Sequence, residues 1–447
     1  MTPLALARIR PSFTAAFAAA VLAVLAAPCA HATQIARVVS PGGIEAWLVR
    51  EPSPLIAVEF AFSGGAAQDP AEKPGVANLA ADLWDDGAGD LDTKAFQERL
   101  ERKSIELGFS AGRDYIHGSL RTLTANRDEA FDYLRMAVTQ PRFDVDAVER
   151  TRGQLIARLK RQTTNPGDMA SRVWWQTAFP GHPYGRPVSG TADSVARITI
   201  DDLRAYTRRV LARGNLKIAV VGDIDAATLG PLLDRTFGDL PAEPQLVPVA
   251  DVTMQGGERR IVLPLDVPQA VVTFGARGIP RHDPDFMPAY VLTHILGGGT
   301  LSSRLYREVR EKRGLAYGVS ASLSWLEHAA VLLGGTATRS AVTGEALGVI
   351  ESEMHRLAQE GPTEDEVEDA KSALAGSYEL DLDTSGKIAA QLVQIQIDNL
   401  GIDYIDRRSS LIGAVTLADT KRVAKRLLDT GLLVTIAGHP QGVQSTD

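Results

Sequence analysis

Cysteine is nearly absent from this chain of 447 residues. Cys29 is the only one, and it lies in an N-terminal segment that resembles a leader. A mature chain without cysteine forms no internal disulfide and offers no thiolate for catalysis or metal binding. The sequence therefore excludes a disulfide framework and a cysteine nucleophile.

Basic tracts are missing as well. The chain has 47 Lys and Arg against 55 Asp and Glu, a net charge of −8. Nucleic-acid binding relies on clustered positive charge, so we expect no nucleic acid as a partner. Hydrophobic residues make up 45% of the chain. With this length, that content predicts a globular protein of roughly two to four domains.

Residues 1–32 are organised like a secretory signal peptide. A positively charged start precedes the apolar run 13–27, and small residues precede a predicted cleavage site after Ala32. The run is short for a membrane span, so an uncleaved anchor is the weaker alternative. Pro28 argues against lipid attachment to Cys29.

Beyond this segment, no run is long and apolar enough to span a bilayer, so we expect no stable membrane anchor. Removal of the leader leaves 45 basic residues against 55 acidic ones, a net charge of about −10. Export without disulfides predicts a periplasmic location in a bacterium.

The rest of the chain repeats itself. Three motifs recur at nearly constant offsets of 214, 210 and 216 residues, which indicates duplication of a unit of roughly 210 residues. The motif pairs are 54–60 with 268–274, 108–111 with 318–321, and 218–223 with 434–439.

Both units predict the same order of elements. An apolar strand (55–62; 269–276) is followed by two helices (75–85 and 92–103; 286–296 and 302–313), a strand (105–111; 315–323), a long amphipathic helix (144–162; 363–380), a short helix (200–212; 416–429) and a buried strand (216–222; 432–437).

This order predicts the α+β class, with two homologous domains that each pack helices on one face of an antiparallel-rich sheet. The Pro-rich, polar stretch 241–258 is the predicted linker. The predicted division is a signal peptide (1–32), an N-terminal domain (33–240), this linker and a C-terminal domain (259–447).

Several segments resemble the pitrilysin/insulinase family of zinc metallopeptidases, in particular its bacterial branch with two homologous domains per chain. The likeness extends over residues 35–440, and the segment 302–321 is the most distinctive. The segments are Gly75-Val76-Ala77, PGHPYGRPVSGT (180–191), ITIDDLRAYTRRVL (198–211) and SSRLYREVREKRGLAYGVSA (302–321). The resemblance implies a clamshell of two domains.

Peptidases of that family carry H-x-x-E-H on the first helix, where two His bind zinc and the Glu acts as general base. The matching positions here are Asn78, Ala81 and Asp82, and Arg158 lies about where a later helix should supply a Glu ligand. We therefore expect no metal and no cofactor on this chain, which should be inactive alone.

The histidines do not form another metal motif, because no pair has i, i+4 spacing. His182 is predicted to be a turn residue bonded to backbone, and His294, which precedes three glycines, is a candidate to line a cleft. The other histidines after the predicted leader are His117, His282, His328, His355 and His439.

The glycine-rich segment 297–321 contains the second set of candidates. Gly297, Gly298 and Gly299 permit positive φ and close approach of another backbone. They are the predicted substrate-binding residues, to be met by an extended peptide; phosphate binding is a weak alternative without a following GK[ST]. Apolar residues at helical spacing, Leu301, Leu305 and Val309, should face the core.

The family has an Arg and a Tyr seven residues apart in this turn, and Arg310 and Tyr317 match that spacing. The resemblance implies that both assist catalysis at a zinc site by donating hydrogen bonds to the substrate carbonyl or the oxyanion. Without the resemblance, a solvated Arg and a half-buried Tyr are the simpler interpretation. The neighbouring Arg304, Arg307 and Arg313 are predicted to be surface or partner contacts.

These features favour a catalytically incomplete subunit of a heterodimeric zinc metalloendopeptidase. A homologous partner would carry the zinc, unfolded peptides would be the substrate, and Arg310 and Tyr317 would act on the partner's site. The alternative is a non-enzymatic scaffold or peptide-binding protein. A hydrolase with another mechanism is disfavoured, because no Ser/His/Asp or Cys/His arrangement is visible.

Overall fold

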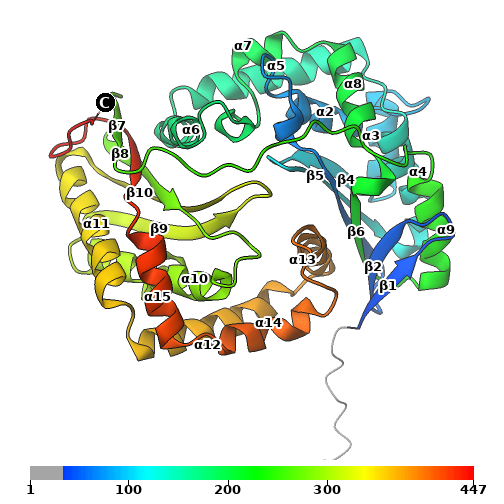
Figure 1. The fold of residues 1–447 in the computed structure, drawn as a ribbon. Coiled ribbons are helices and arrows are strands. Elements are labelled where there is room, and N and C mark those ends of the chain that lie inside the picture. Colours follow the sequence, from blue (N-terminus) through cyan, green and yellow to red (C-terminus); the bar gives the residue numbers. More distant parts are fainter. Residues whose placement is uncertain (1–33, 447) are drawn as a thin grey trace, which may run out of the picture.

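The computed structural model describes residues 34–446, so the predicted signal peptide and Cys29 lie outside the described part. It contains two sheets, one from each repeat (Figure 1), and the predicted α+β class is confirmed. The first sheet has the order β1-β2-β6-β3-β5-β4 and the second β7-β11-β8-β10-β9.

The two sheets have the same pairing pattern, as expected for a duplicated unit. β2 pairs in parallel with β6, and β7 with β11, while the other neighbours in both orders run antiparallel. The strands are β1 (Ile35–Val39), β2 (Glu45–Arg50), β3 (Leu55–Ser63), β4 (Glu106–Ala111), β5 (Tyr115–Leu123), β6 (Leu216–Gly222), β7 (Arg260–Leu263), β8 (Gln269–Arg277), β9 (Ala316–Trp325), β10 (Ala330–Arg339) and β11 (Leu433–Ala437).

Helix ends follow local signals in the sequence. For example, α8 and α15 hold equivalent places in the two repeats, and both begin with a capping box, at Thr199 and Thr416. The helices are α2 (Val76–Trp84), α3 (Thr93–Arg102), α4 (Arg127–Thr139), α5 (Val145–Gln162), α6 (Pro166–Ala178), α7 (Ala192–Ala196), α8 (Ile200–Val210), α9 (Ala226–Phe237), α10 (Phe286–Thr293), α11 (Thr343–Glu360), α12 (Glu364–Asp381), α13 (Ser385–Ile397), α14 (Tyr404–Gly413) and α15 (Leu417–Leu428).

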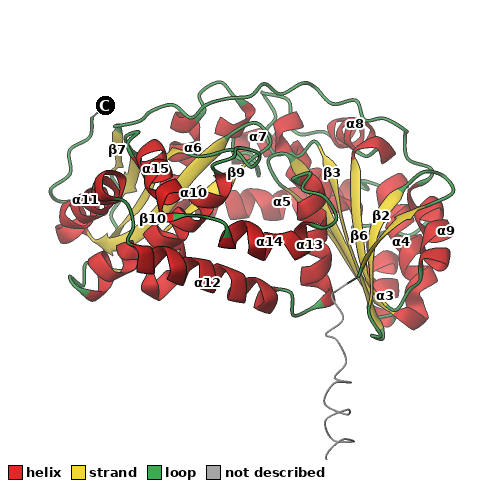
Figure 2. Cartoon of the chain, turned by 60° about the horizontal axis from the view of Figure 1, so that its bottom comes forward, coloured by secondary structure: helices red, strands yellow, loops and turns green. Residues whose placement is uncertain are grey.

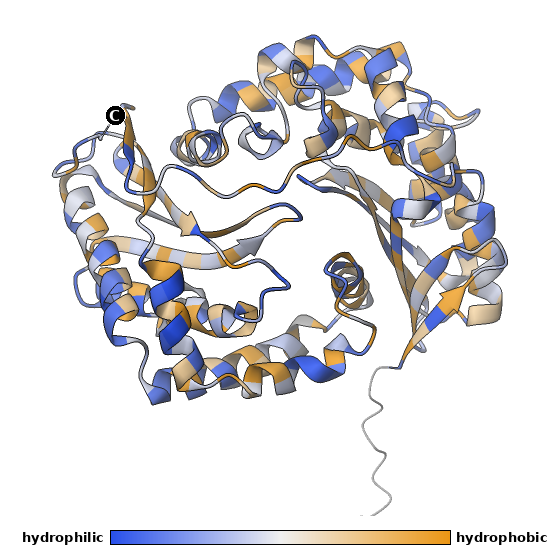
Figure 3. Cartoon of the chain, viewed as in Figure 1, coloured by the Kyte–Doolittle hydropathy of each residue, from blue (hydrophilic) through white to orange (hydrophobic). Residues whose placement is uncertain are grey.

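The first sheet is covered on both faces. Ile218 and Val220 of β6 pack into the core beneath the helices of the first half, whereas Ala219 and Val221 pack against α13, which belongs to the second half. Figure 2 shows α13 on one side of this sheet and α4 and α9 on the other, and Figure 3 shows hydrophobic residues along its strands and on α13. Burial on both faces explains why β6 is apolar without alternation.

The second half receives a helix in return. α6, from the first half, packs on β8 and β11. The Trp174 indole donates a hydrogen bond to the Leu433 carbonyl at 3.1 Å, and it lies over Gly275, which has no side chain to obstruct it. Since α6 and α13 start 219 residues apart, close to the repeat offset, the two halves exchange equivalent helices.

The segment 241–258 contains no helix or strand and runs from one half to the other (Figure 1). The Gln68 side chain exchanges two hydrogen bonds with the backbone of Val247, at 2.7 and 2.8 Å. Further along, the Val252 amide donates to the His328 carbonyl at 2.9 Å. The segment is therefore held against both halves.

A cavity of about 590 Å³ lies between the halves. Tyr115 and His117 line it from the first half, and Arg281 and Trp325 from the second. The halves thus face each other across a polar chamber. Within residues 34–446, no helix has the length and apolar character needed to cross a membrane.

Candidate functional site

The helix that matches the zinc-motif segment begins at an ordered turn. Gly75 precedes α2 with φ of 104°, a conformation that suits glycine. The Asp69 carboxylate accepts hydrogen bonds from the amides of Gly75 and Ala77 at 2.7 and 2.8 Å. Burial nevertheless raises the pKa of Asp69 to about 7. The sequence analysis missed Asp69, because it lies six residues before the N-cap Gly75, outside the position where a cap signal is read.

The three motif positions form a small polar network around a buried methyl group. The Asn78 amide donates to the Asp82 carboxylate at 2.8 Å, and the Ser189 hydroxyl donates to the Asn78 amide oxygen at 2.9 Å. Ala81 is buried at 1% exposure. Asn78 is thus fixed by hydrogen bonds on both sides, and no group at position 81 can accept a proton.

Arg158 approaches this network from α5. Its Nη2 lies 3.9 Å from the Asp82 carboxylate, so the structure brings the predicted third-ligand position next to the predicted motif. Burial raises the pKa of Asp82, and Arg158 opposes that rise. A guanidinium, an amide and one carboxylate do not fit zinc, which binds His, Cys or carboxylate groups. Across residues 34–446, no cluster of three or more His, Cys, Asp or Glu could hold a metal.

The structure brings Arg310 and Tyr317 together in the second half. Arg310 lies on a π-helical turn, Tyr306–Glu311, and Tyr317 is on β9. The Arg310 guanidinium carbon is 4.4 Å from the Tyr317 ring centroid and 4.9 Å from that of Tyr306. The Arg310 guanidinium also donates a hydrogen bond to the Tyr306 hydroxyl. Tyr306 is a residue that the sequence analysis missed.

Tyr317 is 83% exposed, although it is a large aromatic residue at a strand start. The Arg310 cation lies against its ring, and most of the side chain is open to solvent. In Figure 1, β9 and α2 lie in different halves of the chain. The pair and the degenerate motif are therefore separate sites.

The glycine run differs from the prediction in its backbone. Gly297, Gly298 and Gly299 do not adopt positive φ, because residues His294–Gly298 form a π-helical turn that keeps φ negative. The expected close approach is confirmed at Gly297, where a Cβ would lie 2.5 Å from the Ala321 amide nitrogen. Gly298 is the exposed member of the run.

The helix predicted over 302–313 is also irregular. A 3₁₀ turn, Thr300–Ser302, precedes the π-helical turn, and this changes which side chains face inward. Leu305 and Val309 are buried as predicted, but Leu301 is 62% exposed, so its predicted core position was wrong. Gly314 ends the segment in the left-handed region, with φ of 61°.

Arg304 was wrongly predicted to be a surface or partner contact. It is 6% exposed, and its Nε and Nη2 donate to the two carboxylate oxygens of Glu366 at 2.8 and 2.7 Å. Arg307 is half-exposed and pairs with the same carboxylate at 3.2 Å. Burial raises the pKa of Glu366, but hydrogen bonds from Arg304 and Thr363 and the charge of Arg304 outweigh this effect and hold the pKa at about 2. This ion pair fastens the turn to α12.

The two singled-out histidines have different environments. His182 is a turn residue, as predicted: Nδ1 accepts the Tyr184 amide at 3.2 Å, and Nε2 lies 3.0 Å from the Ala250 carbonyl. His294 lines a small cavity of about 140 Å³ together with Arg307 and Glu366. Burial lowers the pKa of His294, which favours the neutral ring.

Comparison with known proteins agrees with this geometry. The family profile described as "Insulinase (Peptidase family M16)" matches residues 48–192, and "Peptidase M16 inactive domain" matches residues 197–374. A protein of Helicobacter pylori described as "Non-peptidase homolog YmxG" is 27% identical over 329 residues, 73% of this chain and 76% of the relative. An uncharacterized zinc protease of Streptomyces coelicolor, SCO5738, is 27% identical over 368 residues, 77% of this chain and 79% of the relative.

Among solved structures, a peptidase M16 inactive domain from Pseudomonas fluorescens matches with a TM-score of 0.85 and 27% identity. The match covers 92% of this chain and 99% of that one. A protease from Helicobacter pylori has the same fold, with a TM-score of 0.82 at 20% identity, over 91% of this chain and all of the other.

Proposed function

This chain belongs to peptidase family M16 as an inactive member, and on that premise we propose that it is the non-zinc subunit of a heterodimeric zinc metalloendopeptidase. Its partner would be a homologous chain with an intact H-x-x-E-H motif, and its substrates would be unfolded peptides. We place the pair in the periplasm, from the leader-like N-terminus.

The observation that carries the proposal is the contrast between the two candidate sites. Asn78, Ala81 and Arg158 leave the first half without ligands or a general base, yet Arg310 and Tyr317 still stand together with an open hydroxyl. Tyr317 is 83% exposed and stacked on Arg310, an arrangement that a chain without function does not need. A site divided between two subunits accounts for both facts.

In this mechanism the residues of this chain bind and orient the peptide. The Arg310 guanidinium and the Tyr317 hydroxyl donate hydrogen bonds to the carbonyl oxygen under attack, and these bonds strengthen as negative charge develops on it. Zinc bound by the proposed partner would supply an activated water. Gly298, exposed in the glycine run, offers backbone groups to the extended peptide.

The test measures cleavage of a quenched fluorescent peptide by this protein, by its zinc-bearing homologue and by the mixture. We expect activity in the mixture alone. Arg310→Ala and Tyr317→Phe should each lower kcat/KM of the mixture by about 10²–10³-fold, since each removes one donor to the oxyanion. Arg307→Ala is the matched control, because Arg307 lies on the same turn but pairs with Glu366.

The second candidate is a scaffold or peptide-binding protein without catalytic partnership, which the description of the Helicobacter relative as a non-peptidase homolog favours. Unchanged activity on mixing, with no effect of either substitution, would replace the first proposal by this one.

A further inference from the structure

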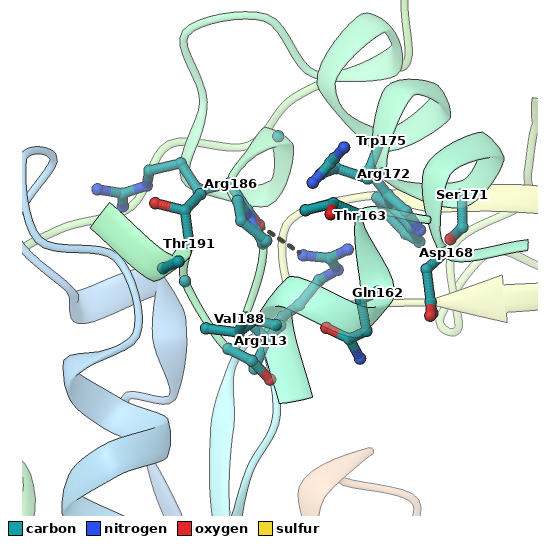
Figure 4. Close-up of a pocket in the computed structure, with 16 residues that line it drawn as sticks. Arg113, Gln162, Thr163, Asp168, Ser171, Arg172, Trp175, Arg186, Val188 and Thr191 are labelled. Carbon is teal, nitrogen blue, oxygen red and sulfur yellow. Dashed lines mark hydrogen bonds between the residues drawn. The ribbon is translucent and has the colours of Figure 1, made fainter. Parts of the chain in front are cut away.

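A second pocket lies in the first half, beside the degenerate motif (Figure 4). Its volume is about 280 Å³. The C-terminal end of α5, helix α6, the loop 185–192 and Arg113 from the β4–β5 turn form its walls. Ser189, one of the lining residues, is the hydroxyl that holds Asn78.

Positive charge dominates the interior of this pocket. The Arg113 guanidinium carbon lies over the Trp175 ring, 3.8 Å from its centroid, and the group donates one hydrogen bond to the Arg186 carbonyl at 3.2 Å. Arg172 projects into the same space from α6 (Figure 4). Among the described residues, no ion pair joins Arg113 or Arg172 to a carboxylate within the pocket; the Asp114 carboxylate, which lines the chamber, favours the charged form of Arg113 from that side.

The remaining charges do not neutralise these two groups. Arg186 uses its own guanidinium elsewhere, donating to the carbonyls of Asp69 and Ala67 at 2.9 and 3.4 Å. Asp168 lies at the edge of the pocket and is exposed. Burial lowers the pKa of Arg113 to about 10, so the group remains charged at neutral pH.

The shape and chemistry of the pocket suit a carboxylate. A guanidinium presents parallel N–H donors that match the two oxygens of a carboxylate, and Arg113 is already positioned by its contact with Trp175. Thr163, Ser171 and Thr191 also line the pocket; the Thr163 and Thr191 hydroxyls donate to Lys160 and Ser194 within their own turns.

The pocket also adjoins the chamber. Arg113 and Trp175 line both this pocket and the 590 Å³ cavity between the halves. A peptide in the chamber therefore needs to extend only past this shared wall to reach the pocket.

We propose that this pocket binds a carboxylate of a peptide, either an acidic side chain or the C-terminal carboxylate, between Arg113 and Arg172. The inference rests on the proposed function only in taking the ligand to be a peptide. It would make this chain the subunit that selects and positions substrates.

The experiment uses this chain alone, without a peptidase partner. A fluorescent, unstructured peptide is made in four versions, with Glu or Gln at one internal position and a free or amidated C-terminus, and binding is followed by anisotropy. We expect the fully neutral peptide to bind about 10-fold or more weakly than a version with a carboxylate. The two singly charged versions distinguish the side chain from the C-terminus as the source.

Arg172→Gln should weaken binding of the charged peptide by about 10–100-fold and leave the neutral peptide unaffected. Arg161→Gln removes the same charge from an exposed position near the pocket and should change little. Arg113→Lys tests the role of the planar guanidinium, since lysine keeps the charge but lacks the paired N–H donors. Glutarate should displace the bound peptide better than inorganic phosphate.

Equal binding of all four peptides, an unchanged affinity in Arg172→Gln, or stronger competition by phosphate than by glutarate would each overturn the assignment. These outcomes are independent of the mixing experiment. Cleavage by the mixture without carboxylate preference would remove this inference alone, and carboxylate binding without cleavage would remove the heterodimer alone.

Discussion

At the degenerate motif, a positively charged side chain lies close to the one carboxylate that remains. Arg158 reaches Asp82 at 3.9 Å, but the two side chains are 49% and 35% exposed. An ion pair of this kind contributes about 0–1 kcal/mol to stability. The pair therefore contributes little to the stability of the fold. Its main effect is that the guanidinium keeps a metal cation away from Asp82.

This geometry predicts that ligands can be restored. Asn78→His and Asp82→His place two imidazoles at i, i+4 on one helical face, and Arg158→Glu supplies the third ligand from α5. We expect the triple variant to retain about one zinc per chain after dialysis, measured by atomic emission, and to remain inactive because Ala81 provides no base. The double variant that keeps Arg158 is the control and should retain far less. Equal zinc in both would show that Arg158 does not occupy the ligand position.

Glu59 gives a prediction about pH. Burial on β3 raises its pKa to about 7, with Arg121 opposing. Because the folded protein then binds a proton that the unfolded chain has released, stability falls as pH rises from about 4 to about 7. Glu59→Gln should remove this loss of stability at higher pH.

Urea unfolding measured at about pH 4 and pH 8 checks this expectation. The variant should match the parent protein at the lower pH and gain on the order of 1–3 kcal/mol over it at the higher pH. Taking the difference between the two proteins cancels the contributions of Asp69 and Asp85, whose pKa values burial also raises to about 7. A variant less stable at both values would contradict the burial argument.

At the scale of elements, most of the helices and strands that the sequence analysis named end within one or two residues of the observed ones, because their ends have readable signals. Strands β5 and β10 and helices α4, α6, α11 and α13 were not predicted. Thr199 and Thr416 mark helix starts by capping boxes, and Gly314 marks a helix end. The turns around residues 294–311 could not be predicted, since π-helical turns have no sequence period of their own and arise from packing. For the same reason, the contact of Arg310 with Tyr306 was not foreseen.

The tight fit of the glycine run predicts the effect of adding a methyl group. Gly297→Ala places a Cβ 2.5 Å from the Ala321 amide nitrogen and 2.9 Å from its Cβ. Overpacking against a strand backbone should cost about 1–3 kcal/mol, measured by urea unfolding. Gly318→Ala on the same strand meets nothing within 4 Å and should cost little. Similar stabilities of the two variants would contradict the close approach.

For the whole molecule, the repeat predicted two similar units but not the exchange of α6 and α13. Periodicity shows which face of a helix is apolar, but it does not show which sheet that face covers. The site was predictable to a similar degree. The positions of Asn78, Ala81 and Asp82 could be found by spacing, whereas the hydrogen bond from Ser189 and the pocket around Arg113 depend on segments far apart in the chain.

The exchange predicts that damage to one half reaches the other. Trp174 is fully buried between α6 and the second sheet, so Trp174→Ala should destabilise the protein by about 3–5 kcal/mol. Hydrogen exchange should then increase in β3 as well as in β8, because the halves unfold together. Gln176→Ala, exposed on the same helix, should have little effect. Faster exchange confined to β8 would show that the halves are independent.

The exchanged helices also set an order of events during synthesis. The face of the first sheet that packs on α13 (Ser385–Ile397) stays uncovered until that helix has been made, and the surface on which α6 packs is incomplete until β11 (Leu433–Ala437) joins β8. Neither half of the chain can complete its fold while the ribosome is still adding residues to the other. A protein that remains open until its last strand emerges would suit the export that we propose, because its folding would be deferred until after passage through the channel.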